Sequence, residues 1–465
     1  MRSLRIIALA ATTAALATAP LAAQRPGDGN SSDPTIARIW RLGMDSSHVQ
    51  QLAQALFDSV GPRLTGSPGL LAASNWAINQ YKSWGIDAKR ENYGTWRGWR
   101  RGTSHIDLTS PRVRSLDGTM LAWSPGTNGK PINAEVIVLP KFKDSTEFVK
   151  WLPQAKGKIV MVSPAWPTCR PSEDWFRWST PESMARIDSE IGQMQRDWSV
   201  MTGPDGKPDS TKLYRGTGYT LALGTGTLGM RLEKAGVLAT ISSRPKLAGF
   251  PNPFATAGGG RGGRGGRGGG GGASDHGGGP TAAEAAAFGR GGRNAPEGSG
   301  GWGTTEIFET YNTVAPAVTL DCEDYGLVFR LAEHHQKPML HLDLDAQLLG
   351  EQPVFNTVAE IKGSEKPNEY VMLSAHFDSW DGSSGATDNG TGTMMAMEAM
   401  RILKLAYPHP KRTILVGHWS GEEEGDIGSS AFAADHPEVL KGLQALFNQD
   451  NGTGEIDSVQ TNGFL

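Results

Sequence analysis

The sequence predicts an α/β protein built on an open parallel sheet. Three apolar runs near the carboxyl end have the length of strands, namely Val371 to Ala375, Thr413 to Trp419 and Leu443 to Phe447. Each run is soon followed by histidine or carboxylate side chains. Because the carboxyl ends of parallel strands share one edge of a sheet, these side chains are expected to converge although they are far apart in the sequence.

Length and charge bear on the number of domains and on the partners of the protein. A chain of 465 residues has room for two or three domains and a sizeable core. The formal net charge of -3 gives no global electrostatic signature. It therefore indicates neither nucleic acid nor a membrane surface as a partner, and nothing in the composition predicts an oligomeric state.

The amino-terminal stretch has the pattern of a signal peptide. In residues 1–24, Arg2 and Arg5 precede an Ala/Leu/Ile-rich core that ends in small residues. Threonines and Pro20 interrupt this core, which makes a stable membrane anchor the less favoured interpretation. Residues 25–33 form a polar leader that is expected to be disordered. The sequence thus predicts an exported protein, periplasmic or secreted.

Residues 34–133 are expected to form the amino-terminal part of the main domain. Two helices, over residues 48–60 and 70–85, flank a turn rich in glycine and proline. No titratable cluster stands out between them, so the segment is interpreted as structural. For the WRGWRRG stretch that follows, a ligand contact is possible through Trp96, Trp99 and the arginines, but a solvated cationic and aromatic surface is favoured.

Residues 134–345 are predicted to form a separate β-rich module. Short β-branched runs such as AEVIVL and GKIVMVSP are typical of strands. Cys169 and Cys322 both fall in this module and can pair in an exported protein, although the sequence leaves their pairing open. Within the module, residues 257–303 are rich in glycine and arginine and are expected to be a flexible loop. An RGG-type contact with nucleic acid is the alternative, which the scarcity of arginines and aromatics disfavours.

The chemistry is expected in residues 346–465. His376 and Asp378 end the first strand, where alternation points both side chains the same way and the carboxylate suits support of a metal-bound imidazole. Asp388 lies on a glycine-flanked turn before a helix that begins near Thr391. Its two oxygens can bridge two cations, or it can form an ordinary Asx turn. Asp450 follows the third strand.

Two adjacent glutamates follow the second strand. In extended chain, neighbours point in different directions, so of Glu422 and Glu423 one can bind metal while the other acts as a general base. Glu424 is assigned to solvent, and His418, inside the strand, is interpreted as a core residue. One imidazole and several carboxylates form a ligand set that suits zinc.

These motifs resemble a known family. AHFDS, GATDNGTG and SGEEEGDIGS are similar to the motifs of the co-catalytic di-zinc exopeptidases, metallopeptidase family 28, which contains leucyl-type aminopeptidases and glutamate carboxypeptidases. The β-rich module resembles the protease-associated domain inserted in many of them. The resemblance implies a mixed sheet flanked by helices, two zinc ions and a peptide or dipeptide substrate. It also implies a cis peptide between Asp388 and Asn389. The implied roles are His376 and Asp450 on one zinc, Glu423 on the other, Asp388 as the bridge, Glu422 as the base and Asp378 as the support of His376.

The chain departs from the family pattern in two places. The remaining zinc ligand of the family is a histidine downstream of the position matched by Asp450, and His436 is out of order for that role. We interpret the chain as truncated at its carboxyl end, with an incomplete enzyme as the other possibility. Asp426 also replaces a residue that is usually apolar. The competing functional hypothesis is a binding protein that kept the peptidase fold and lost catalysis.

Overall fold

The computed structural model describes residues 31–142, 145–170, 172–198, 228–244, 310–450 and 452. The predicted signal peptide, most of the polar leader and the Gly/Arg-rich loop lie outside these residues. The chain divides into two compact units, residues 1–47 and 48–465. The first contains helix α1 (Pro34–Asp45), whose N-terminus is capped by the Asp33 carboxylate. None of the described helices combines the length and apolar character that a membrane span requires.

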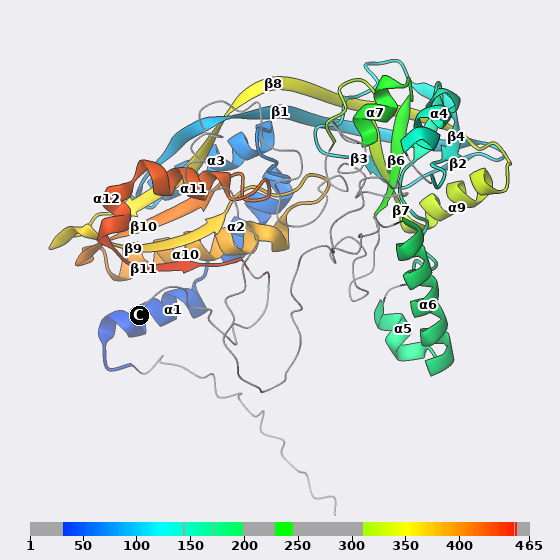
Figure 1. Ribbon diagram of the computed structural model, residues 1–465. Helices are drawn as coiled ribbons and strands as arrows, with labels where there is room; N and C mark the ends of the chain where they lie inside the picture. The colour runs from blue at the N-terminus through cyan, green and yellow to red at the C-terminus, as the bar shows by residue number, and fades with distance from the viewer. Residues whose placement is uncertain are drawn as a thin grey trace, which may run out of the picture. The chain divides into compact units, whose positions relative to one another are not determined.

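The second unit is organised by one mixed sheet (Figure 1). Strand β9 (Lys366–His376) pairs in parallel with β10 (Arg412–Trp419) on one side and with β11 (Leu443–Asn448) on the other. The three predicted strands are therefore confirmed, and their carboxyl ends do lie at one edge. On its other side β10 pairs antiparallel with β8 (Met339–Ile361), which makes the sheet mixed, as the family resemblance implies.

Helices cover both faces of this part of the sheet. On one face, leucine, alanine and methionine side chains of three helical segments pack against β8, β9 and β10, with Leu56, Ala77 and Met397 fully buried. On the other face, Phe432 and Val439 pack against Trp419. The covering elements are α2 (Val49–Ala53) with its continuation η1 (Gln54–Val60), α3 (Pro68–Ser83), α10 (Thr391–Ala406), α11 (Ile427–Asp435) and α12 (Pro437–Gly442).

Local signals in the sequence explain where α3 begins and ends. The Ser67 hydroxyl accepts a hydrogen bond from the Leu70 amide, and Pro68 occupies the first turn, where its missing N–H costs nothing. The helix stops before Gly85, which has a φ of +71° that glycine adopts without steric cost. The predicted pair of helices around a Gly/Pro turn is thus confirmed, and it places residues 61–66 beside the carboxyl end of β9 through hydrogen bonds with Phe377 and Ser379.

Two long strands connect this part to the β-rich part of the chain. β1 (Asp87–Ser110) pairs antiparallel with β8 along nearly its whole length, and Figure 1 shows them side by side. The far end of β8 pairs with β4 (Ile132–Val138), which continues in parallel through β5 (Ile159–Met161), β6 (Ala239–Arg244) and β7 (Ala317–Asp321). The remaining elements are β2 (Arg114–Ser115), β3 (Gly118–Met120), α4 (Ser145–Ala155), α5 (Ser172–Trp178), α6 (Pro181–Trp198), α7 (Leu228–Lys234) and α9 (Cys322–Glu333).

The β-rich part has its own core, and this core corrects one expectation. Trp99 is fully buried there, with its indole N–H donated to the Ser124 carbonyl, and Trp96 packs against the same cluster. The prediction of a solvated aromatic surface is therefore wrong for Trp99. The reason is that Trp99 faces the core of this part of the sheet, where the guanidinium of Arg101 lies over its ring. The domain boundaries at residues 133 and 345 stay predictions.

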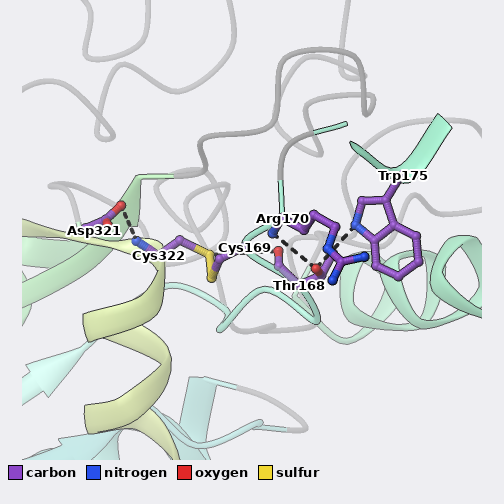
Figure 2. The surroundings of a disulfide bond; sticks show 6 residues. All are labelled: Thr168, Cys169, Arg170, Trp175, Asp321 and Cys322. Carbon is purple, nitrogen blue, oxygen red and sulfur yellow. Dashed lines mark hydrogen bonds between the residues drawn. A yellow bond between two sulfur atoms is a disulfide. The ribbon is translucent and has the colours of Figure 1, made fainter. Parts of the chain in front are cut away.

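A disulfide joins Cys169 to Cys322, with 5.6 Å between their Cα atoms. Figure 2 shows the bond between the start of α9 and the segment that leads into α5. Beside it, the Thr168 hydroxyl accepts hydrogen bonds from the Arg170 amide and from the Trp175 indole. The pairing that the sequence left open is thus present, and it ties two segments 153 residues apart.

Candidate metal centre

His376 lies at the base of the candidate centre, at the end of β9, and is only 2% exposed. Its two ring nitrogens face different partners. Nδ1 is 3.6 Å from the Asp378 carboxylate and 3.2 Å from the Asp378 carbonyl oxygen. Nε2 is 3.0 Å from Asp388 Oδ1, 3.2 Å from Asp450 Oδ1 and 3.8 Å from Glu422 Oε2. Asp378 can therefore orient the ring through Nδ1, while Nε2 faces three other carboxylates.

Asp388 reaches the centre from the turn between Gly385 and α10. The backbone leaves helical geometry at Asp388 and Asn389, and the peptide bond between them is cis, as the family resemblance implied. The Asn389 side chain holds this turn, because its amide nitrogen donates to the Gln449 carbonyl and its oxygen accepts from the Gly392 amide. That bond to residue 449 also brings the end of β11, and with it Asp450, next to Asp388.

Glu422 and Glu423 follow β10 in a turn rather than in extended chain. Gly421 has a φ of +75°, and the amides of both glutamates point to the buried Asp378 carboxylate, at 3.3 Å and 3.2 Å. An oxygen of each glutamate lies within 4.8 Å of the other and of a His376 nitrogen. The expectation that neighbouring side chains point in different directions is therefore wrong here, because the turn and the shared Asp378 acceptor bring both carboxylates to the same side.

Glu424 and the nearby histidines also have clear positions. Both carboxylate oxygens of Glu424 are shielded from solvent, so its assignment to solvent is wrong. His418 is a core residue as predicted, with Nε2 at 2.7 Å from the Tyr81 hydroxyl. His436 lies between Glu91 and Glu438. Among the described residues, neither histidine belongs to a group that could hold a metal.

The described residues form two such groups around His376. One consists of His376, Asp388 and Asp450, and the other of His376, Glu422 and Glu423, with one ligand atom of each residue within 4.8 Å of the others in its group. The structure thus brings together the five residues predicted as metal ligands or general base. Asp378 lies on the other side of the His376 ring, near Nδ1. The side chain of Asp388 is 69% exposed and that of Asp450 is 36% exposed, so the centre is open to solvent on the carboxylate side.

The electrostatics of the centre favour a cation. Burial alone would lower the pKa of His376, but hydrogen bonds with Asp378, Asp388 and Asp450 raise it far above the ordinary value. Burial raises the pKa of Glu422 to about 7, and burial together with the charges of Asp378 and Asp388 raises that of Glu423 to about 9. Burial is the main cause of both shifts, so these carboxylates hold a proton at neutral pH more readily than usual in the absence of a cation beside them.

The donor set fits zinc. Imidazole nitrogen and carboxylate oxygen are ordinary zinc ligands, and a carboxylate behind the second ring nitrogen is the common way to orient a metal-bound histidine. The Nε2 side of His376, with Asp388, Asp450 and Glu422 near it, is the place where an ion would be held. A divalent cation there would lower the raised pKa values of the glutamates.

Sequence reasoning missed three residues that shape the centre. Thr65 donates its hydroxyl to Asp378 and accepts the Gly421 amide. On β8, Asn356 accepts the Ser420 amide and donates to the Gly428 carbonyl, so it holds both ends of the glutamate turn. Arg63 is fully buried, and burial lowers its pKa to about 10, which leaves it cationic at neutral pH. None of the three belongs to a titratable cluster in the sequence, so no local pattern marked them as parts of the site.

The fold and this site define an α/β protein with a carboxylate-rich candidate metal centre at the carboxyl ends of parallel strands. The model of peptidase family M28 matches residues 356–461. Carboxypeptidase Q of Bos taurus is 34% identical over 422 residues, which cover 90% of this chain and 68% of that protein. Carboxypeptidase Q of Rattus norvegicus is 26% identical over 398 residues, which cover 86% of this chain and 63% of that protein. The chain belongs to peptidase family M28.

A solved structure agrees in fold. The crystal structure of a peptidase M28 precursor from Shewanella amazonensis has a TM-score of 0.50 at 20% sequence identity, and the match covers 90% of this chain and 73% of that one. The likeness shows the shared mixed α/β fold. The chain spans a little less than two thirds of the length of the carboxypeptidase Q proteins of Rattus norvegicus and Xenopus laevis.

Proposed function

We propose that the protein is a zinc-dependent exopeptidase that hydrolyses a terminal peptide bond of a peptide or dipeptide. The observation that carries this proposal is the Nε2 side of His376, which Asp388, Asp450 and Glu422 approach from three different loops. Family membership supports hydrolysis of peptide bonds, and the name carboxypeptidase of the matched relatives supports action at a chain end.

We assign the residues to two zinc ions as follows. His376 and Asp450 would hold one ion, Glu423 would hold the other, and Asp388 would be shared between them. The group of His376, Asp388 and Asp450 supports the first half of this assignment. Asp378 supports His376 at Nδ1 and keeps the glutamate turn in place through the amides of Glu422 and Glu423.

Glu422 is the proposed general base. Bound zinc supplies a Lewis acid and lowers the pKa of a water molecule. The Glu422 carboxylate, 3.8 Å from His376 Nε2, takes a proton from the attacking water and returns it to the nitrogen of the leaving amine. Glu423 lies deeper, with a pKa of about 9 that a cation would lower, which supports its assignment as a ligand.

We also propose that the protein acts outside the cytoplasm. The pattern of residues 1–24 supports export, and the disulfide between Cys169 and Cys322 supports an oxidising compartment, since such bonds are rare in the cytosol. The protease-associated character of residues 134–345 remains part of the proposal and rests on the resemblance alone.

Two matched substitutions in the intact protein test the assignment of the glutamates. Glu422→Gln should leave the zinc content unchanged and lower the rate of peptide hydrolysis by a factor of about 10² or more, because a positioned base is lost. Glu423→Gln should weaken zinc binding, because an amide is a poorer ligand than a carboxylate. Metal analysis and a peptide-hydrolysis assay on both variants distinguish them.

The outcomes have different meanings. Zinc loss in the Glu422 variant with retention in the Glu423 variant would exchange the two roles, and full activity of the Glu422 variant would remove that residue from the mechanism. A wild-type protein that binds zinc and hydrolyses no peptide would favour the binding protein with a peptidase fold.

A further inference from the structure

We infer that Arg63 is a positioning residue of the metal centre, which holds the loop of Asp388 against the strand end of His376. A role in zinc binding rests on the proposed function, whereas the contacts of Arg63 are those of the folded chain itself. Arg63 is 0% exposed and comes from the segment between η1 and α3, far in sequence from every candidate ligand.

The hydrogen bonds of the guanidinium connect the two ligand-bearing segments. Nε donates to the Phe377 carbonyl at 2.7 Å, and Phe377 stands between His376 and Asp378. On the other side, Nη1 donates to the Ser384 carbonyl at 2.9 Å and Nη2 to the Gly385 carbonyl at 2.8 Å, at the start of the turn that carries Asp388. One planar group therefore sets the spacing between the two segments.

The backbone of Arg63 fixes the same region. Its amide donates to the Ser379 hydroxyl at 3.2 Å, and its carbonyl accepts the Ser379 amide at 3.3 Å. Gly385 packs directly on Ser379 and on the guanidinium, because a Cβ placed there would lie 2.4 Å from the Ser379 Cβ and Oγ and 2.9 Å from Arg63 Nη2. The loop thus cannot approach or withdraw without disturbing the guanidinium.

An arginine suits this position for a geometric and an electrostatic reason. Only a guanidinium offers five donors in a rigid plane, so lysine cannot serve carbonyl groups from several segments at once. All four hydrogen bonds of the group among the described residues go to carbonyl oxygens, the fourth to Gly61. Its charge is instead balanced at longer range by Asp378, Glu423 and Asp388, of which Asp378 is fully buried and Asp388 is exposed. Arg63 therefore also offsets repulsion among the carboxylates.

The test compares Arg63→Lys with Arg401→Lys in the full chain. Arg401 is another buried arginine, and two of its hydrogen bonds go to Glu398 on its own helix, α10, so its substitution disturbs a buried guanidinium that has no hydrogen bond to the segments of His376 and Asp388 among those described. Zinc affinity is measured by competition with a chromophoric chelator. Arg63→Lys should weaken it about 10- to 100-fold, the usual effect of losing a residue that orients ligands. Arg401→Lys should leave it unchanged.

A second measurement is independent of zinc. The Gly390 amide donates to the Gly385 carbonyl, the same oxygen that accepts from Arg63 Nη2. In the zinc-free protein, hydrogen exchange over residues 384–390 should accelerate in Arg63→Lys and stay as in the wild type in Arg401→Lys. Unchanged exchange and unchanged affinity in a folded Arg63→Lys variant would overturn the inference.

If Arg63→Lys does not fold, Gly385→Ala gives a second test, because its Cβ would lie 2.4 Å from the Ser379 side chain and 2.9 Å from Arg63 Nη2 and so displaces the loop from both while the buried charge remains. Weakened zinc binding with faster exchange in this loop supports the inference, and wild-type values for both refute it. A wild-type protein that binds no zinc would refute the proposed function only, since the exchange measurement still reports on Arg63.

Discussion

At the scale of single residues, protons and a bound metal ion would compete for the His376 imidazole in the proposed zinc site. Carboxylates that surround the buried ring raise its pKa, and burial raises that of Glu423 to about 9. Zinc requires a neutral imidazole and an ionised carboxylate, so it must displace protons that these groups hold at neutral pH. The affinity of the centre is thus tied to pH through the same contacts that build it.

Zinc affinity should therefore rise with pH between about 6 and 9. Each displaced proton contributes roughly a tenfold increase per pH unit as long as the pH is below the pKa of the group that loses it. Calorimetric titrations in buffers with different ionisation enthalpies should detect the released protons. His436→Gln is the control, since His436 lies among Glu91 and Glu438 and outside the centre. An affinity independent of pH would contradict the electrostatic account.

At the scale of elements, β10 is held in place by a buried histidine that must stay neutral. His418 is fully buried and makes its hydrogen bond to Tyr81 on α3, so it joins the sheet to the helix that covers it. Burial lowers the pKa of His418 to about 3. Protonation would place a charge in this core with no carboxylate paired to it among the described residues.

We expect this histidine to make the fold sensitive to acid. The unfolded chain binds a proton at His418 below a pH of about 6.5, whereas the folded chain does so only near pH 3. As the pH is lowered from 6.5 to 3, the free energy of unfolding should therefore fall by up to about 1.4 kcal/mol per pH unit. Denaturant titrations at several pH values compare the wild type with His418→Gln, which cannot titrate. The stability of the variant should depend less steeply on pH over this range. Parallel pH dependences would show that other groups govern the acid response.

The parallel strands were predictable from the sequence, but the residues that hold the candidate ligands in place were not. Strands β9, β10 and β11 are short apolar runs that end in polar side chains, so local pattern suffices to place His376, Asp388 and Asp450 at one edge. Arg63 and Asn356 act through hydrogen bonds to backbone groups more than sixty positions away. No periodicity or composition reports such contacts. The common direction of Glu422 and Glu423 likewise depends on a turn at Gly421 and on Asp378 as a shared acceptor.

At the scale of the whole molecule, the disulfide is expected to contribute to stability by closing a long loop. Cys169 and Cys322 are 153 residues apart, and a cross-link of that span restricts the unfolded chain strongly. Replacing both with serine should lower the free energy of unfolding by about 2–5 kcal/mol. Thermal and denaturant unfolding of the double variant measure this loss, with the reduced wild type as a comparison. Since neither cysteine belongs to the metal groups, zinc affinity should not change, and equal stability with and without the bond would refute the prediction.

The pairing of β1 with β8 has a consequence for how the protein is made. β1 ends at Ser110 and its partner begins at Met339, so the ribosome must synthesise everything between them before the strands can meet. At about 5–20 residues per second, β1 waits on the order of tens of seconds with its hydrogen-bonding groups and Trp99 unprotected. Such late, distant pairing slows folding and exposes the nascent chain to aggregation. The same delay would help a protein that must stay unfolded until it is exported, because β1 and β8 cannot pair early.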